Sequence, residues 1–412
     1  MDLSHLRRDF PILFVKRPNG KPLIYFDNAA TTLKPQQVMN AVMEYYEKYP
    51  FNVHRGVYKP SQELTDLYEK SREKIAKFIG CGPEELVFVK NTTEGINLVA
   101  YGIEWKAGDE VVTSPVEHHS NMIPWQIMKK RFGITLKYVD ITKDGQVDLE
   151  SLSQLVSKNT RIVSVCHVSN VLGSINDIKE IAKIAHENEA LLLVDAAQSV
   201  PHMPINVKDL ECDLLVFSGH KMLGPTGIGC LYIREGVEEE IVPPFGGGEM
   251  ISSVELNDFR LNDMPWRFEP GTPNIAGTLG LAAAVDYLCS VGMGAVREHE
   301  KELTAYALKL LGEDGEIEIY GPKDAEKRSG LIAFNIRNVS GHLVAMLLDE
   351  LENIAVRSGF HCAEPLHRRL GIRKSVRASF YIYNTKEELE IFGRALSRVK
   401  SEFLKNDKRD SN

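Results

Sequence analysis

The sequence predicts an α/β protein built from two domains. From about residue 20 to 270, short apolar runs alternate with stretches of helical periodicity, which is typical of a largely parallel sheet. The chain has 412 residues, more than one hydrophobic core usually organises. The apolar runs that we interpret as strands are 85–89, 110–114, 161–168, 190–195, 214–218 and 229–233.

The pattern changes after about residue 276. A long helical stretch comes first, followed by a strand candidate at 329–336, a helix near 341–351 and a final helix. We therefore predict a large α/β domain at 20–275. A smaller α+β domain is expected from residues 276–412 together with the N-terminal segment 1–19.

The composition excludes several classes of protein. A net charge of −8 with scattered basic residues is unlike a nucleic-acid-binding protein. No apolar stretch reaches 18 residues, and the first residues lack the apolar core of a secretory signal. We expect a cytoplasmic protein that binds neither nucleic acid nor membrane.

The six cysteines are widely spaced and form no CxxC pair, so free thiols are expected. Cys166, Cys212, Cys230 and Cys289 lie in apolar runs and are interpreted as small core residues. Cys362 differs because it lies in the polar loop RSGFHCAEP. It is the candidate reactive thiol.

Polar residues follow the predicted strands, where open parallel sheets bind ligands. After the first run, Asn91 can cap a helix, and Glu94 would complete a capping box. The free amides and hydroxyls of Thr92 and Thr93 then form an anion site suited to a phosphate. A capping box alone is more often only structural.

His118 and His119 follow the second run, and His167 and Asn170 follow the third. Adjacent histidines seldom point at one metal ion, so no metal site is expected. Asp195 ends the fourth run. If the chain turns helical there, Gln198 lies on the same face.

Lys221 follows the fifth run, between Ser218 and a glycine-rich segment. A lysine at the end of a core strand either reaches water or is used for chemistry. An amine, a buried acid, a phosphate cradle and a flat partner such as His118 are the parts that hold pyridoxal phosphate. Lys221 would form a Schiff base with its aldehyde, and Asp195 would keep its ring nitrogen protonated. Ser218 and His220 can reach the same phosphate.

Nine motifs together resemble a known family. The chain is similar to class V aminotransferases, and within them to group II, Suf-type cysteine desulfurases. The resemblance implies the fold of type I pyridoxal phosphate enzymes, with a seven-stranded sheet. The motifs are YFDNAATT (25–32), NTTEGIN (91–97), EHHSN (117–121), HVSNVLG (167–173), VDAAQS (194–199), SGHKMLGPTGIG (218–229), FGGGEMI (245–251), FEPGTPN (268–274) and RSGFHCAEP (357–365).

The resemblance also implies roles for single residues. Lys221 would bond the cofactor, with His118 stacked on the ring, Asp195 at the ring nitrogen, and Gln198 and Asn170 near the ring hydroxyl. The phosphate would be held by Thr92, Thr93, Ser218 and His220, with Thr272 coming from the second subunit of a homodimer. Arg377 would bind the substrate carboxylate near Ala29 and Asn170, and Cys362 would accept sulfur.

The implied reaction converts L-cysteine to L-alanine and leaves a persulfide on Cys362 for an acceptor protein, as in iron–sulfur cluster assembly. Selenocysteine lyase, aminotransferase or kynureninase-type activity, and a non-catalytic partner-binding role, remain alternatives. The chain departs from the family's Gly-His-His-Cys, because Phe360 stands where the first histidine is usual. Pro270 replaces a commoner alanine.

Overall fold

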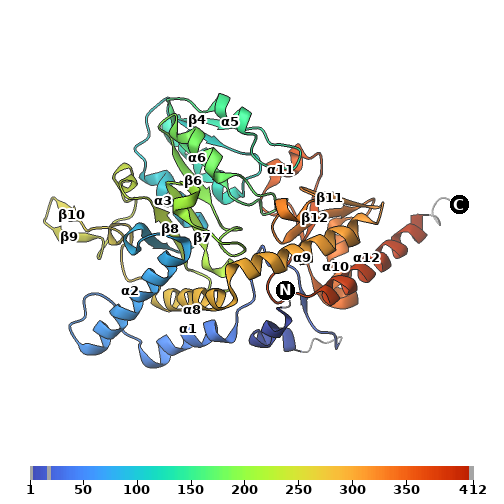
Figure 1. Ribbon diagram of the computed structural model, residues 1–412. Coiled ribbons are helices and arrows are strands. Elements are labelled where there is room, and N and C mark those ends of the chain that lie inside the picture. The colour runs from blue at the N-terminus through green and yellow to red at the C-terminus, as the bar shows by residue number, and fades with distance from the viewer. Residues whose placement is uncertain (1–2, 16–19, 408–412) are drawn as a thin grey trace.

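The computed structural model describes residues 3–15 and 20–407. Its centre is a seven-stranded sheet in the order β2-β8-β7-β6-β5-β3-β4 (Figure 1). All neighbouring strands are parallel except β8, which is antiparallel to β2 and to β7. The strands are β2 (Leu86–Val89), β3 (Glu110–Thr113), β4 (Thr135–Tyr138), β5 (Thr160–Cys166), β6 (Leu191–Asp195), β7 (Leu214–Ser218) and β8 (Gly229–Ile233).

The predicted α/β class and the mostly parallel sheet are confirmed, and each of the six apolar runs forms a strand. The sequence missed β4. This strand lies at the edge of the sheet, and none of its four residues is buried. An edge strand needs no continuous apolar run, which is why the pattern did not reveal it.

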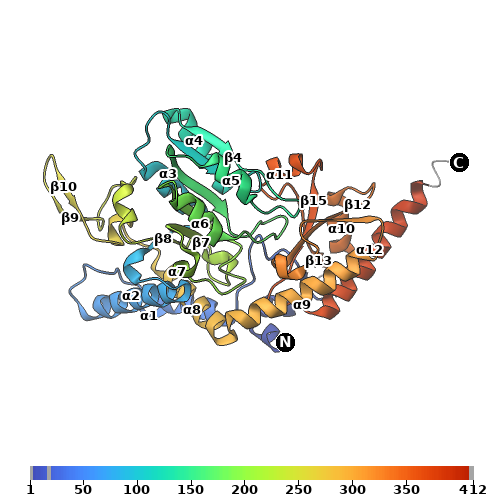
Figure 2. The same cartoon turned by 45° about the horizontal axis from the view of Figure 1, so that its top comes forward.

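Helices cover both faces of this sheet (Figures 1 and 2). One face packs against α2 (Lys59–Ile79), α6 (Ile178–His186) and α8 (Ile275–Val291). The other face packs against α3 (Thr92–Gly102) and α4 (Ile123–Phe132). Because parallel strands are buried on both faces, they are apolar throughout rather than alternating.

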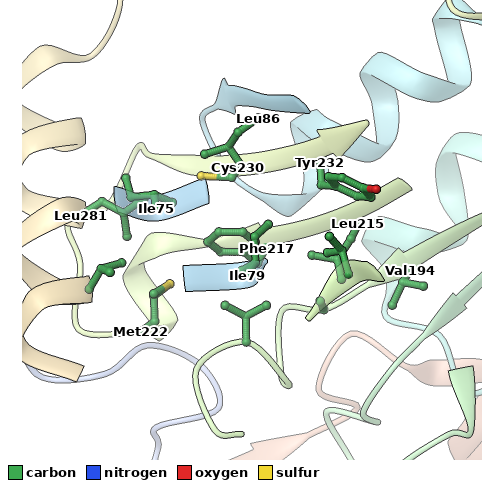
Figure 3. Close-up of a cluster of buried hydrophobic side chains, with 14 of the residues drawn as sticks. Ile75, Ile79, Leu86, Val194, Leu215, Phe217, Met222, Cys230, Tyr232 and Leu281 are labelled. Carbon is green, nitrogen blue, oxygen red and sulfur yellow. The ribbon is translucent and has the colours of Figure 1, made fainter. Parts of the chain in front are cut away.

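The core under α2 and α8 fixes the strand from which Lys221 emerges. Figure 3 shows Phe217 of β7 and Cys230 of β8 among the side chains that pack around Ile75 and Leu281. Phe217 and Cys230 are register partners and are both fully buried. Truncating a phenylalanine in such a site costs about 3–5 kcal/mol of stability.

The second part of the structure is an antiparallel sheet in the order β11-β12-β15-β14. It is covered by long helices, and α9 runs from the large sheet to this smaller one (Figure 1). The predicted strand at 329–336 and helix near 341–351 are present. The elements are β11 (Ile317–Tyr320), β12 (Leu331–Ile336), β14 (Arg357–Gly359), β15 (Ser375–Ser379), α9 (Met293–Gly312), α10 (Gly341–Glu352) and α12 (Lys386–Asp407).

The N-terminal segment contacts both parts. β1 (Ile24–Tyr25) pairs in parallel with β13 (Ile354–Ala355), whereas Phe10 packs in the large core. The division into domains 20–275 and 1–19 with 276–412 stays a prediction, and residues 1–2, 16–19 and 408–412 lie outside the described part.

The remaining elements are short or peripheral. A hairpin of β9 and β10 projects from the edge of the molecule (Figure 2). The helices and strands are α1 (Gln36–Lys48), α5 (Leu149–Leu155), α7 (Val207–Leu210), α11 (Glu364–Arg369), β9 (Ile251–Val254) and β10 (Phe259–Leu261). Short 3₁₀ helices are η1 (Ser4–Asp9), η2 (Pro11–Phe14), η3 (Pro83–Glu85), η4 (His119–Asn121), η5 (Gly219–Lys221), η6 (Val237–Glu240), η7 (Trp266–Phe268) and η8 (Ala325–Lys327).

Within the described ranges, no single helix is long and apolar enough to cross a membrane. Among the described helices, only the pair of α8 and α9 has the length and composition of a membrane span, and the two helices are bent by 74° relative to each other. Both helices contribute buried side chains to the hydrophobic clusters.

The cysteines are free, and Cys166, Cys212 and Cys230 are buried as expected. The expectation for Cys289 was wrong, because this residue is exposed. It lies in the last turn of α8, where the helix face turns away from the core.

Candidate active site

A pocket lies at the carboxyl edge of the large sheet and is closed on one side by residues of β14, β15 and the loop after β14. β2 and β7 are both antiparallel to β8, so their carboxyl ends meet at the same edge. The pocket brings together twelve of the thirteen predicted site residues: Ala29, Thr92, Thr93, His118, Asn170, Asp195, Gln198, Ser218, His220, Lys221, Cys362 and Arg377.

Lys221 and Asp195 form the charged centre of this pocket. Burial lowers the pKa of the Lys221 amine to about 8, and the Asp195 carboxylate partly opposes that shift. Burial raises the pKa of Asp195, and Lys221 opposes that shift in turn. An amine with such a pKa is available as a neutral base or nucleophile near physiological pH.

The anion cradle lies at the start of α3. Asn91 caps this helix, since its side-chain oxygen accepts the Glu94 N–H at 3.0 Å. The second half of the predicted capping box differs, because the Glu94 carboxylate accepts the N–H of Lys90 instead of that of Asn91. The Ser218 hydroxyl accepts the Thr92 N–H at 2.9 Å and so links the end of β7 to this helix.

His118 is held in one orientation by its own loop. Its Nδ1 accepts the backbone N–H of Ser120 at 3.1 Å, which leaves the ring proton of the neutral form on Nε2. Burial, followed by the nearby Lys221, lowers the pKa of His118 to about 3. The ring is therefore neutral at physiological pH. Ser120 also contacts Thr93 through a 2.7 Å hydroxyl pair, and sequence reasoning did not single it out.

Gln198 has a fixed amide with one free acceptor. Its Nε2 donates to the carbonyl oxygen of Ala29 at 2.7 Å, and this assigns the two ends of the amide. Its Oε1 is buried and accepts no hydrogen bond from the described residues. A buried acceptor without a partner suits a ligand hydroxyl that donates to it.

Arg377 lies in β15 with 2% of its surface exposed, so it is not a solvated strand-end charge. Its Nη1 donates to the Asn170 carbonyl oxygen at 2.8 Å, and its Nη2 donates to Asp27 at 3.2 Å. A guanidinium has five N–H donors, so others remain to meet a carboxylate. Arg357 also lines the pocket, 3.6 Å from Asp27. The sequence showed it only as one more charge in a loop motif.

The nucleophile candidate lies on a pinned loop. His361 and Cys362 have positive φ angles of 49° and 56°, which non-glycine residues seldom adopt. Asn170 Nδ2 donates to the His361 carbonyl oxygen, and His119 N–H donates to that of Cys362, each at 2.7 Å. Cys362 is exposed on the pocket wall.

Thr272 is the one predicted site residue that this pocket does not contain. It is exposed and lines a separate cavity with Lys90 and Glu94. No group of three or more His, Cys, Asp or Glu among the described residues could hold a metal ion.

Residues 24–392 match the family model described as aminotransferase class-V. The chain belongs to the class V aminotransferase family. It is 48% identical over 407 residues to a probable cysteine desulfurase of Halalkalibacterium halodurans, which covers 98% of this chain and 99% of the relative. It is 46% identical to the cysteine desulfurase of Haloferax volcanii, which covers 95% of each chain.

Solved structures of cysteine desulfurases agree with this result. The apo cysteine desulfurase of Thermococcus onnurineus superposes with a TM-score of 0.91 at 45% identity, covering 96% of this chain and 98% of that one. The S-sulfonic acid form of an Escherichia coli cysteine desulfurase gives a TM-score of 0.89 at 33% identity, covering 97% and 99%.

Pyridoxal phosphate is the cofactor of class V aminotransferases, and the pocket fits it. The free Oε1 of Gln198 suits the ring hydroxyl, and the Asp195 carboxylate suits the ring nitrogen. The start of α3 with Ser218 and His220 suits the phosphate, and Lys221 suits the aldehyde. When bound, the cofactor supplies an electron sink for a carbanion at the substrate Cα.

Proposed function

We propose that this protein is a cysteine desulfurase that converts L-cysteine to L-alanine and carries the sulfur as a persulfide on Cys362. The observation that carries the proposal is a single pocket lined by Lys221, Arg377 and Cys362. An aminotransferase needs the amine and the carboxylate binder but not the thiol. The names of the relatives, at 48% and 46% identity over nearly the whole chain, support the same activity.

The substrate carboxylate binds the free N–H groups of Arg377, while Asn170 and Asp27 keep the guanidinium in place. This fixes the substrate Cα near Lys221. The neutral Lys221 amine accepts the proton of Cα on Nζ, and the low pKa of about 8 keeps that amine available. A positioned base of this kind contributes on the order of 10²–10⁴ in rate.

Cys362 then attacks the sulfur of the substrate as a thiolate. The new bond joins the two sulfur atoms, and the bond between the substrate sulfur and its Cβ breaks. The electron pair of that bond stays with the carbon, which is protonated to the methyl group of alanine. One cysteine and one protein thiol thus give one alanine and one protein persulfide, and no outside oxidant is needed.

Product analysis tests this function directly. The protein loaded with pyridoxal phosphate and given L-cysteine with a reducing thiol is expected to release alanine and sulfide in equal amounts. Pyruvate, or a keto acid formed without sulfide, would instead establish a lyase or a transaminase. L-selenocysteine is tested as a second substrate. A selenocysteine lyase would turn over the selenium compound alone and leave L-cysteine unchanged.

Several finer features belong to the same proposal. The short loop between β14 and α11, which carries Cys362, supports the Suf-type group II, in which the sulfur passes to a dedicated acceptor protein in pathways such as iron–sulfur cluster assembly. The protein acts as a homodimer in which Thr272 reaches the cofactor phosphate of the other subunit. We place this activity in the cytoplasm.

A further inference from the structure

The loop that carries Cys362 lacks one of the family's two histidines, and another histidine, His367 of α11, lies beside it. Phe360 stands where the family usually has the first histidine of Gly-His-His-Cys. The ring of Phe360 packs edge-on against His367 of α11, with 5.7 Å between the ring centroids and an angle of 90°. His367 is fully buried, and its ring also lies 5.8 Å from that of His361.

The hydrogen bonds around His367 have only one consistent set of directions. His367 Nδ1 lies 3.0 Å from the carbonyl oxygen of Ala363, which can only accept, so Nδ1 carries the proton. In the neutral ring, Nε2 is then an acceptor. It lies 2.9 Å from the Ser375 hydroxyl, which therefore donates its proton to His367.

The same reasoning continues to His361. Its Nε2 lies 3.1 Å from both the carbonyl oxygen and the hydroxyl oxygen of Ser375. The carbonyl can only accept, and the hydroxyl proton already points to His367. His361 Nε2 must therefore be the donor to both oxygens, and the Nδ1 of its neutral ring carries a lone pair.

That lone pair is buried and has no hydrogen-bond partner within the described part of the chain. His361 is 6% exposed, and its Nδ1 has no hydrogen-bond partner among the described residues. His361 itself lines the pocket, next in sequence to Cys362. A buried acceptor without a donor is unfavourable, so a donor that arrives in the pocket gains by meeting it.

The charges around His361 keep its ring neutral. Burial, then Arg377, then His367 lower its pKa to about 2, with Arg357 adding to the effect and the Ser375 carbonyl opposing it. The ring therefore offers a hydrogen-bond acceptor rather than a cation in the working pH range.

We propose that His367 is a positioning residue that, through Ser375, holds the ring proton of His361 on Nε2, so that Nδ1 accepts a hydrogen bond from a thiol S–H in the pocket. This rests on the proposed function, because the thiol belongs either to the cysteine substrate or to Cys362.

Two substitutions of similar size separate this role from simple packing. His367→Gln places its amide oxygen where Nε2 accepts from Ser375. His367→Asn reaches only the Ala363 carbonyl and offers Ser375 no acceptor. Folding of both variants is checked by their thermal unfolding, and only variants that unfold cooperatively are compared.

The first readout is the protonation of the ring nitrogens, measured by ¹⁵N NMR on cofactor-free protein with labelled histidine. We expect the proton on Nε2 of His361 and on Nδ1 of His367 in the wild type. In His367→Asn, a mixture of both His361 tautomers should appear, because the Ser375 hydroxyl is free to donate to Nε2. A wild-type His361 with its proton on Nδ1 would overturn the proposal.

The second readout is function. Loss of one such hydrogen bond predicts a fall in kcat for L-cysteine of about five- to tenfold in His367→Asn. His367→Gln should restore most of it, and KM should change little in either variant. Equal losses in the two variants would show a merely structural role and overturn the proposal.

The third readout identifies the thiol. The rate at which iodoacetamide alkylates Cys362 is followed by peptide mass spectrometry in cofactor-free protein. A changed rate in His367→Asn assigns the S–H to Cys362, whereas an unchanged rate with a lower kcat assigns it to the substrate. No change in either measurement would refute the thiol contact.

Failure of the wild type to make alanine would refute the proposed function instead, and it would leave the NMR and alkylation results standing.

Discussion

The backbone N–H of His119 donates to the carbonyl oxygen of Cys362 at 2.7 Å. This bond joins the loop after β3 to the loop after β14, two segments that are more than 200 residues apart. It ties the segment that carries His118 to the loop that carries Cys362. The positive φ angles of His361 and Cys362 persist because bonds of this kind hold the loop.

Asn170→Ala is expected to loosen this loop, because the Asn170 amide donates to the His361 carbonyl oxygen at 2.7 Å. Removing a buried hydrogen bond costs about 1–3 kcal/mol, so local opening should become about 5- to 150-fold more frequent. The rate of hydrogen exchange of the His119 amide measures how often the loop opens. Asn188→Ala is the control, because Asn188 follows α6 and donates a similar amide-to-carbonyl bond to Ile184 of that helix; the exchange of the His119 amide should stay unchanged. Unaltered exchange in Asn170→Ala would contradict the pinning.

Cys362→Ser should bind pyridoxal phosphate normally and release alanine from cysteine more than about 10²-fold more slowly, since serine cannot accept sulfur from a thiol. The wild type given cysteine without an acceptor should gain the mass of one sulfur atom on the peptide that contains Cys362. Cys289→Ser is the matched control, because Cys289 is also exposed but lies outside the pocket. Added sulfur on Cys166, or full turnover by Cys362→Ser, would contradict the assignment.

Lys221→Met should stabilise the cofactor-free protein at pH 7 and have less effect as the pH rises. Burial lowers the folded-state pKa of Lys221 to about 8, below the ordinary value of 10.5 for a lysine, so folding opposes the charged amine. Between these pH values the unfolded chain binds more protons, and the stability of the wild type rises with pH. At pH values below 8 this penalty is on the order of 3 kcal/mol.

Urea unfolding of wild type and Lys221→Met at pH 7 and pH 10 measures this difference. Lys309→Met, on the exposed face of α9, provides the control. A stability gap that stays constant or widens toward pH 10 would show that Lys221 is not a buried amine with a depressed pKa.

Arg377→Lys should raise KM for cysteine by about 10- to 100-fold, because an ammonium cannot form the two parallel bonds that a guanidinium offers a carboxylate. Steady-state kinetics measure this effect. Arg369→Lys is the control, since Arg369 pairs with Asp140 on the surface and does not line the pocket. A KM within twofold of the wild-type value would remove Arg377 from substrate binding.

A shared site predicts complementation between two inactive variants. In a heterodimer of Lys221→Ala and Thr272→Ala chains, one site carries both lesions and the other carries neither. Random mixing makes half of the dimers heterodimers, so about a quarter of wild-type activity should return. Mixed dimers are isolated with two different affinity tags. Heterodimers without activity would place Thr272 in the site of its own subunit.

The sequence by itself determined the large sheet and most of the chemistry. Apolar runs such as 214–218 must be buried on both faces, and a polar residue that ends such a run must lie at the carboxyl edge of the sheet. The sequence alone therefore places Asp195 and Lys221 near one another. The edge strand β4 escaped because its side chains are not buried and need no apolar pattern.

Only the tertiary structure decided contacts between segments far apart in the chain. Hydrogen bonds between loops depend on how distant segments pack against one another, and residue type does not encode that geometry locally. The burial of Arg377, the presence of Arg357 in the pocket and the link from His367 through Ser375 to His361 are of this kind. The sequence supplied the histidines, and packing of α11 against β15 determined which ring nitrogen of each carries its proton.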